Sequence, residues 1–561
     1  MPEGASSTLK KLEDMRAEYG EGSAERKLAL LQELRKARLR TSAEVLRLHE
    51  VLCFLRAYPD EAGLLGCVEA MLAGFHRRSD LRRHRRSLAD TGIAGTVIHY
   101  RFFQPTASWL ARRFGDALTI DWKSFRRRDR LEPLLPILAL FAETPGLDEI
   151  AFSVREWIRR LKGPGETDAA FLIRRFDALD LDPTVRETLY DELDPPIRLA
   201  PRPDTPARGR EKYEAAAVVY QVRPLSRARP SLLEEARRPP VSIRPVQPAE
   251  GRKLIDLARG AMVTRSRDLD VFCHADPDDV RLVDCGEGLQ FACLGAIPER
   301  RLLLEAVYGF LTLKNGVPIG YVLASALFGS AEVAYNVFDT YRGGEAALVY
   351  GRVVGTLRSL FAADSFTIVP FQLGDDNEEA LRSGAWWFYQ KLGFRPRDPG
   401  ILRLMERELR RMRMSPRYRS SVPTLRKLTA ANVFLSLGAA REDVLGVISL
   451  ANVGLQVTRY LAARFGSGRE QAERACVREA ARRLGLRSRD GFSPGERLAW
   501  TRWAPLVMVL PGLEAWGPAE KRALVDVIRA KGGRRESDFV RRFDRHRRLR
   551  RAIRELAADP A

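Results

Sequence analysis

A strand, a glycine turn and a helix follow one another in residues 333–361, and this segment constrains the fold most strongly. Val333, Tyr335 and Val337 alternate with their neighbours in a run of β-forming residues, which predicts a strand. The Tyr-Arg-Gly-Gly sequence at 341–344 interrupts the strand, and apolar residues at helical spacing then predict a helix. The N-terminus of a helix presents unpaired N–H groups and the positive end of its dipole. The turn therefore suits a pyrophosphate group.

The neighbouring sequence supplies further strands and helices. Asn315-Gly316 predicts a hairpin turn, and Gly393 predicts a helix stop. The polar stretch 263–288 is expected to be irregular. The predicted strands cover residues 241–245, 290–297, 302–314, 317–327, 333–338 and 366–373, and two further predicted helices cover residues 249–262 and 378–392.

The order of these elements, together with the sequence AWWFYQKLGF at residues 385–394, resembles the GNAT superfamily of acyl-CoA N-acyltransferases. In that family the late helix carries the pattern A-x-x-hydrophobic-Tyr-x-x-x-Gly-Phe, which is matched by Ala385, Phe388, Tyr389, Gly393 and Phe394. The resemblance covers residues 241–398 and implies a mixed, mostly antiparallel sheet. It also implies acetyl-CoA or another acyl-CoA as cosubstrate, with transfer of the acyl group to an amine that the sequence does not identify.

The resemblance further implies a set of site residues. In the family the turn holds the CoA pyrophosphate, a backbone amide near the preceding strand polarises the thioester carbonyl, and a tyrosine on the late helix protonates the departing thiolate. Tyr389 matches that tyrosine. No motif assigns the general base, so Glu332, Asp339 and Glu305 remain alternatives. The residues implied to bind the cosubstrate are Phe338, Tyr341, Arg342, Gly343, Gly344, Glu345, Ala346 and Ala347.

Two departures from the family pattern keep a second class of function open. Glu345 stands where the commonest form of the turn has glycine, and Arg382 stands where many relatives have asparagine. A carboxylate beside the CoA phosphates is repulsive unless it points away from them at the start of the helix. The alternative is a catalytically inactive GNAT-like scaffold or binding module, with nucleic acid or another polyanion as its partner.

The rest of the chain predicts helical regions on either side of this domain, and hence a mixed α+β fold. The expected domains are an α-helical region at 1–193, a Pro- and Arg-rich linker at 194–240, the GNAT-like domain at 241–400 and an α-helical region at 401–561. Thr41 to Glu44 predicts a helix start, and the apolar run at 134–141 predicts a buried segment. Similar elements recur in the same order at residues 130–179 and 497–547, which indicates either that the two helical regions are related modules or that such elements recur by chance among Arg- and Leu-rich helices.

The charge of the chain indicates an anionic partner. The formal net charge is +21, and arginines cluster at residues 77–86 and 541–551. Such clusters are either solvated helix faces or surfaces for a polyanion or an acidic protein.

Cysteine spacing and hydropathy exclude other classes. The six cysteines form no C-x-x-C pair, which argues against a disulfide or zinc framework, and we expect no metal. No stretch approaches the ~18 apolar residues of a membrane span, and the first residues lack an apolar signal core. We therefore expect a cytoplasmic protein without a membrane partner.

Overall fold

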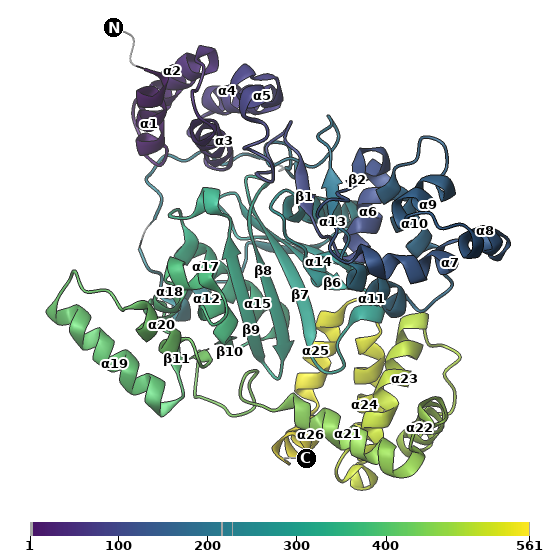
Figure 1. The fold of residues 1–561 in the computed structure, drawn as a ribbon. Coiled ribbons are helices and arrows are strands. Elements are labelled where there is room, and N and C mark those ends of the chain that lie inside the picture. Colours follow the sequence, from purple (N-terminus) through teal and green to yellow (C-terminus); the bar gives the residue numbers. More distant parts are fainter. Residues whose placement is uncertain (1–3, 215–216, 227, 560–561) are drawn as a thin grey trace. The chain divides into compact units, whose positions relative to one another are not determined.

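The computed structural model describes residues 4–214, 217–226 and 228–559 (Figure 1). The chain divides into two compact units, which are described separately. Unit 1 comprises residues 1–224, 253–274 and 314–318, and unit 2 comprises residues 225–252, 275–313 and 319–561. The predicted mixed α+β class, with a large and mostly antiparallel sheet and helical regions at both ends of the chain, is confirmed.

Unit 1 begins with a group of helices around a leucine-rich core. The helix predicted to start at Thr41 begins there with a capping box. The Thr41 hydroxyl accepts a hydrogen bond from the Glu44 amide at 3.2 Å, and the Glu44 carboxylate accepts one from the Thr41 amide at 3.0 Å. These helices are α1 (Ala5–Met15), α2 (Ser23–Lys36), α3 (Ser42–Ala57), α4 (Ala62–Ala73) and α5 (Ser79–His84).

A small antiparallel sheet organises the second half of unit 1. Its order is β1-β3-β2, from β1 (Ile98–Tyr100), β2 (Leu118–Ile120) and β3 (Ile197–Leu199). The Pro- and Arg-rich stretch 194–240, predicted as a linker, contains β3 and also α12 (Leu232–Arg237). The helices of this half are α6 (Gln104–Phe114), α7 (Leu135–Leu138), α8 (Thr144–Glu149), α9 (Val154–Leu161), α10 (Asp168–Asp177) and α11 (Pro183–Leu193).

The apolar run at 134–141 is only partly buried. Leu135 and Leu138 lie in the core, but Leu140 is 66% exposed and Phe141 is 90% exposed. The prediction of a strongly buried segment is wrong because the chain forms only the single turn α7 here, which turns one face toward the core.

Unit 2 contains most of a nine-stranded sheet with the order β11-β12-β10-β9-β8-β7-β6-β5-β4. β9 pairs antiparallel with β8 and parallel with β10. The strands are β4 (Ser242–Pro245), β5 (Ala275–Asp284), β6 (Leu289–Ala296), β7 (Ala306–Lys314), β8 (Val317–Leu327), β9 (Ser330–Val337), β10 (Ser365–Ile368), β11 (Arg395–Pro396) and β12 (Val433–Ser436).

The two central parallel strands separate partway along their length. β10 pairs with β9 only from Ser330 to Glu332, whereas β9 remains paired with β8 as far as Val337. After a 3₁₀ turn (Asp339–Tyr341), the chain enters α15 (Ala346–Phe361), as the sequence predicts. The sheet thus opens beside the glycine turn.

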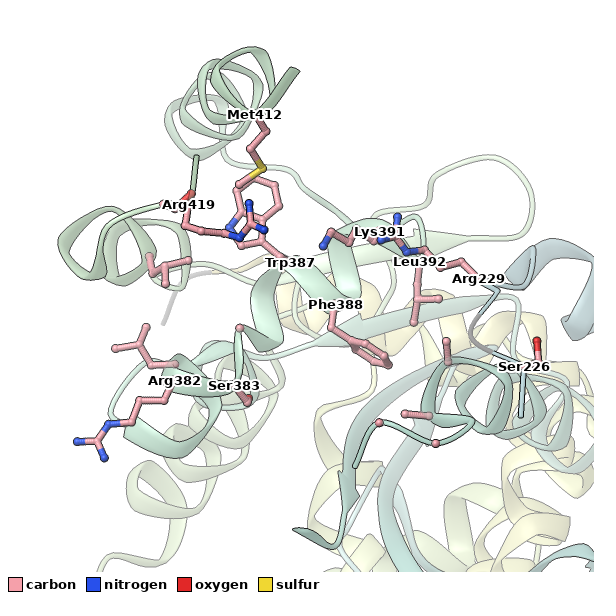
Figure 2. Close-up of a pocket in the computed structure, with 18 residues that line it drawn as sticks. Ser226, Arg229, Arg382, Ser383, Trp387, Phe388, Lys391, Leu392, Met412 and Arg419 are labelled. Carbon is pink, nitrogen blue, oxygen red and sulfur yellow. The ribbon is translucent and has the colours of Figure 1, made fainter. Parts of the chain in front are cut away.

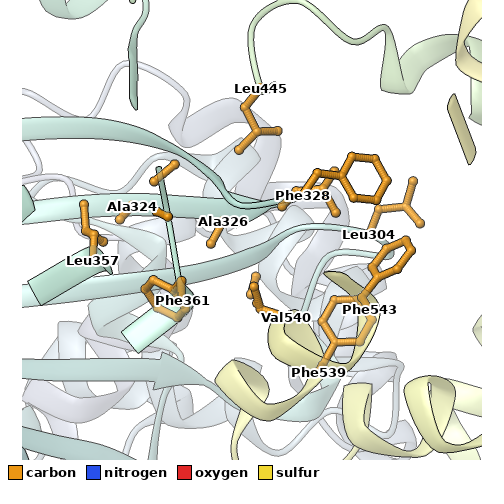
Figure 3. Packing of buried hydrophobic residues seen from close by; sticks show 14 of the residues in the cluster. Leu304, Ala324, Ala326, Phe328, Leu357, Phe361, Leu445, Phe539, Val540 and Phe543 are labelled. Carbon is orange, nitrogen blue, oxygen red and sulfur yellow. The ribbon is translucent and has the colours of Figure 1, made fainter. Parts of the chain in front are cut away.

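Helices from distant parts of the sequence pack on this sheet. α12 lies against α15, where Gly351 and Gly355 leave room for the Glu235 backbone and side chain. Figure 3 shows Phe543 of α25 (Glu536–Arg545) close to Phe328, which lies in the turn between β8 and β9; the centroids of these two rings lie 5.1 Å apart.

Several predicted boundaries are wrong where tertiary pairing decides the structure. The stretch 263–288 holds β5, the predicted strand 366–373 ends at Ile368 because α16 (Pro370–Leu373) follows, and the predicted helix 378–392 breaks at Gly384, whose φ is +72°. The helix pieces on either side of Gly384 are α17 (Glu378–Ser383) and α18 (Ala385–Lys391). The remaining helices are α13 (Pro248–Val263), α14 (Asp270–Cys273), α19 (Pro399–Met414), α20 (Val422–Leu428), α21 (Leu450–Phe465), α22 (Arg469–Leu484), α23 (Pro494–Val509), α24 (Pro518–Lys531), α25 (Glu536–Arg545) and α26 (Arg547–Ala558).

The two segments that suggest a repeat share one local feature. In one, Lys162 follows α9 and its ammonium lies 2.7 Å from Asp168 at the start of α10. In the other, Lys531 ends α24 and pairs with Glu536 at the start of α25. The duplication itself stays a prediction.

Among the described helices, none is long and apolar enough to cross a membrane.

Candidate functional site

A cavity of about 870 Å³ opens at the glycine turn of unit 2 (Figure 2). The N-terminal end of α15 and the turn before it contribute Gly343, Gly344, Ala346 and Ala347. α18 contributes Trp387, Phe388 and Lys391, and Leu392 follows directly after it. The other lining residues are Ser226, Arg229, Leu381, Arg382, Ser383, Gly384, Met412, Arg419, Ser420 and Leu425.

The backbone of the turn is shaped for close approach of a ligand. Gly343 has φ +85°, a left-handed conformation that favours glycine, and a Cβ at this position would meet nothing within 4 Å. The first amides of α15 have no acceptor within the helix, because the helical hydrogen-bond pattern begins only at Val349, which donates to the Glu345 carbonyl at 2.9 Å. The helix N-terminus therefore faces the cavity with unpaired donors and positive potential.

The walls of the cavity carry four cations, and no carboxylate lines it among the described residues. Burial lowers the pKa of the Lys391 ammonium, and the nearby Arg229 and Arg419 guanidinium groups lower it further. Figure 2 shows Arg382, the fourth cation, pointing outward, away from these three. Three cations that repel one another at one site favour an anion with more than one negative charge.

Tyr389 lies behind this wall in an aromatic cluster. Its side chain is buried, and its ring centroid is 5.5 Å from that of Tyr350 and 5.7 Å from that of Phe394. Burial raises the pKa of Tyr389, and a backbone hydrogen bond from Tyr335 lowers it by a smaller amount. The phenol is therefore protonated at neutral pH.

That hydrogen bond places the Tyr389 hydroxyl at the opening in the sheet. The Phe338 amide donates to the Ile319 carbonyl of β8 at 3.0 Å. Because alternate residues of an antiparallel strand direct their amides to opposite sides, the amides of Tyr335 and Val337 face away from β8. They point toward the side where β10 has separated, and this edge carries the Tyr389 hydroxyl.

The acidic alternatives for a general base are not brought together with Tyr389. Glu332 lies an odd number of residues before Tyr335, so the two side chains project from opposite faces of the sheet. Burial raises the pKa of Glu332, and the Glu305 carboxylate raises it further. Asp339 is 80% exposed and lies 2.7 Å from Arg342.

The other predicted cosubstrate residues divide into two groups. Gly343, Gly344, Ala346 and Ala347 line the cavity, as described above. The remaining four do not line it: Phe338 and Tyr341 are buried, Glu345 precedes the first turn of α15, and Arg342 pairs with both Asp339 and Glu379.

Three of the four cations at the cavity were missed from sequence. Arg229 comes from the segment before α12, Lys391 ends α18, and Arg419 follows α19, so nothing local marks them as one set. Trp387 stands at an unspecified position of the family pattern and was given no role from sequence. Its ring is 9% exposed, and its indole N–H has no hydrogen-bond partner among the described residues.

No protein-family model, curated protein or solved structure matches this chain. Functional inference therefore rests on the chemistry of the cavity itself.

The lowered pKa of Lys391 predicts proton uptake when an anion binds. A bound phosphate favours the charged ammonium and raises its pKa back toward the ordinary value of 10.5. At a pH between the pKa of Lys391 in the free protein and its pKa in the complex, the Lys391 ammonium is partly deprotonated in the free protein and protonated in the complex. Just below the ordinary pKa of 10.5 we expect binding of a multiply charged anion to take up protons, measured with pyrophosphate by calorimetry in buffers of different ionisation enthalpy.

The matched variants for this experiment are Lys391→Gln and Lys427→Gln. Lys427 lies on α20 and is exposed. Proton uptake should vanish only in Lys391→Gln. Equal uptake in both variants would show that another group titrates.

Proposed function

We propose that unit 2 is an acyl-CoA-dependent N-acyltransferase that binds acetyl-CoA or a related acyl-CoA. The observation that carries the proposal is the α15 N-terminus opening into a cavity whose described lining residues include four cations and no carboxylate. The pyrophosphate would accept hydrogen bonds from the amides of residues 343–347, and Arg229, Lys391 and Arg419 would neutralise its charge. Trp387, Phe388 and Leu392 supply apolar surface for the pantetheine arm.

The opening between β9 and β10 supports the transfer step. A thioester held along β9 would place its carbonyl oxygen near the outward-facing amide of Val337, which suits stabilisation of an oxyanion, while the Tyr335 amide holds the Tyr389 hydroxyl. The amine attacks this carbonyl, the C–N bond forms and the C–S bond breaks. The amine proton leaves to a base or to water, and the Tyr389 hydroxyl donates a proton to the thiolate.

A second function is binding of the same ligand without transfer. It is favoured by the position of Tyr389 in the aromatic cluster and by the separation of Glu332 from it on the opposite face of the sheet. Binding and turnover must therefore be measured separately.

Cosubstrate binding is tested by enlarging the turn. Gly344→Leu is expected to abolish acetyl-CoA binding in calorimetry, because a side chain at the cavity wall prevents close approach of the phosphates to the backbone. Gly454→Leu is the control, since Gly454 is exposed on α21 and a Cβ there would meet nothing within 4 Å. The absence of acetyl-CoA binding by the unmodified protein would contradict both functions.

A further inference from the structure

A buried acid fixes the loop between α19 and α20, which forms one wall of the cavity. Glu408 of α19 is fully buried, and its carboxylate accepts hydrogen bonds from the Tyr418 hydroxyl at 2.9 Å and from the Ser420 hydroxyl at 2.7 Å. The Arg411 guanidinium lies 3.0 Å from the same carboxylate. Burial raises the pKa of Glu408, but the hydrogen bonds from Ser420 and Tyr418 lower it by more, so the carboxylate keeps its charge. The loop is therefore held on both sides of residue 419.

Arg419 stands between these two anchored residues. Its Nη1 donates to the Pro416 carbonyl at 2.9 Å and to the Tyr418 carbonyl at 2.8 Å, which holds the guanidinium against the loop. The side chain lines the cavity and has no ion-pair partner among the described residues. Because its partners in the loop are neutral carbonyls, the charge of the guanidinium is left to interact with a ligand. A guanidinium fixed in this way suits a phosphate.

Arg419 belongs to a row of three cations. Figure 2 shows the Lys391 side chain between Arg419 and Arg229. Both guanidinium groups act on the Lys391 ammonium, and no carboxylate offsets their effect. The three cations come from three separate segments of unit 2 and line the same cavity, which distinguishes them from arginines along the solvated face of one helix. The row therefore favours an anionic ligand inside the cavity.

The pyrophosphate of an acyl-CoA balances only part of this charge. Each of its two phosphates carries an ester bond and the shared anhydride bond, and so only one negative charge. The three cations and the N-terminal end of α15 together amount to about +3.5 elementary charges, which leaves about +1.5 beside a bound pyrophosphate. A phosphate monoester adds about 1.5 to 2 negative charges at neutral pH. A ligand that carries both groups therefore matches the charge of the cavity.

We propose that Arg419, with Lys391 and Arg229, forms a second phosphate subsite, which binds the 3′-phosphate monoester on the adenosine end of CoA. Lys391 and Arg229 are shared with the pyrophosphate, and Glu408 is a positioning residue that holds the loop. The subsite selects 3′-phosphorylated CoA over its 3′-dephospho form. The inference rests on the proposed function for the identity of the cosubstrate, whereas binding of the phosphate monoester does not depend on acyl transfer.

The test compares ligands that differ only in this phosphate. Calorimetry on the full chain measures the affinity for adenosine 3′,5′-bisphosphate and for adenosine 5′-monophosphate. The same measurement compares acetyl-CoA with 3′-dephospho-acetyl-CoA. We expect the 3′-phosphate to strengthen binding by about 10-fold to 100-fold in both pairs, because it makes charge-assisted hydrogen bonds to a guanidinium and an ammonium.

Replacing Arg419 tests which side chain gives this preference. Arg419→Gln should weaken binding of the 3′-phosphorylated member of each pair and leave the affinity for the other member unchanged. Arg419→Lys should recover part of the preference, because it restores the charge without the fork geometry. The control is Arg417→Gln, since Arg417 is exposed in the same loop and does not line the cavity. The preference should be unchanged in the control.

A second pair of variants tests the positioning role of Glu408. Glu408→Gln should reduce the preference for the 3′-phosphate without changing the affinity for adenosine 5′-monophosphate, because a neutral amide holds the loop more weakly than a carboxylate does. Glu406→Gln removes the same charge at an exposed position of α19 and should leave the preference unchanged.

The outcomes separate this inference from the proposed function. Equal affinities within each pair in the unmodified protein, or equal losses in Arg419→Gln and Arg417→Gln, would overturn the inference. Acetyl-CoA binding without a preference for the 3′-phosphate would leave the proposed function standing. A preference for the bisphosphate without binding of acetyl-CoA would leave the subsite standing and contradict the proposed function. Binding of none of the four ligands would overturn both.

Discussion

Replacing Tyr389 with phenylalanine is expected to lower turnover by about 10²-fold to 10⁴-fold while leaving acetyl-CoA affinity unchanged. The substitution removes only the hydroxyl, and the ring keeps its contacts with Tyr350, Phe388 and Phe394. The hydroxyl lies at the edge of β9, where the departing sulfur would need a proton. Release of free CoA in the presence of an amine acceptor measures turnover, and calorimetry measures affinity.

Tyr350→Phe is the matched control within the same cluster. The Tyr350 hydroxyl is buried and has no hydrogen-bond partner among the described residues, so its removal should leave turnover unchanged. An unchanged rate in Tyr389→Phe would assign Tyr389 to the core and favour the binding function. Equal losses in the two variants would indicate disturbed packing of the cluster rather than loss of a proton donor.

Replacing Lys531 with methionine is expected to lower the free energy of unfolding by about 3 to 5 kcal/mol. The Lys531 ammonium is buried, donates to the Glu305 carbonyl at 2.7 Å and pairs with Glu536. Burial alone lowers the pKa of Lys531 and raises that of Glu536, so each group depends on the other for its charge. The variant leaves the Glu536 carboxylate buried without its ammonium partner. Urea denaturation measures the loss.

The pH dependence gives a second readout of the same variant. Without Lys531 the folded pKa of Glu536 rises further above its unfolded value. A group with a raised folded pKa contributes stability that is complete below its unfolded pKa and is lost as pH rises through the folded pKa. The variant should therefore lose stability as pH rises above about 4.5, the ordinary pKa of Glu536. Adding Glu536→Gln should recover most of the loss, and Lys427→Met at an exposed position should cost little. A loss below about 1 kcal/mol would contradict the prediction.

The sequence predicts the elements whose signals are local. The β-forming run before the glycine turn and the apolar spacing after it place β9 and α15 correctly, since each signal lies within one element. β12 was missed because it is only four residues long and follows a helix, so its alternation of apolar and polar residues is too short to identify a strand. Its strand conformation depends on pairing with β10 and β11. Gly384 divides α17 from α18, although the surrounding residues favour one continuous helix.

The candidate site was only partly predictable for the same reason. The glycine turn is a contiguous motif, but Arg229, Lys391 and Arg419 lie on three segments that meet only in the folded chain. An arginine cluster in the sequence also does not show which carbonyl or carboxylate oxygens accept hydrogen bonds from its guanidinium groups in the folded chain. Arg541 is held by carbonyls at the end of α15, which no pattern near residue 541 reveals.

The separation of β9 from β10 also bears on folding. It leaves the outward-facing amides of Tyr335 and Val337 without a neighbouring strand, and such an edge can recruit a strand from another chain. Here this edge lies inside the sheet and not at its border, because β10 follows β9 in the strand order and itself pairs with β12. The Tyr389 hydroxyl takes the place of a strand at Tyr335. The side chain that we assign to catalysis thus also accepts from one of the two backbone amides that the interruption leaves without a strand.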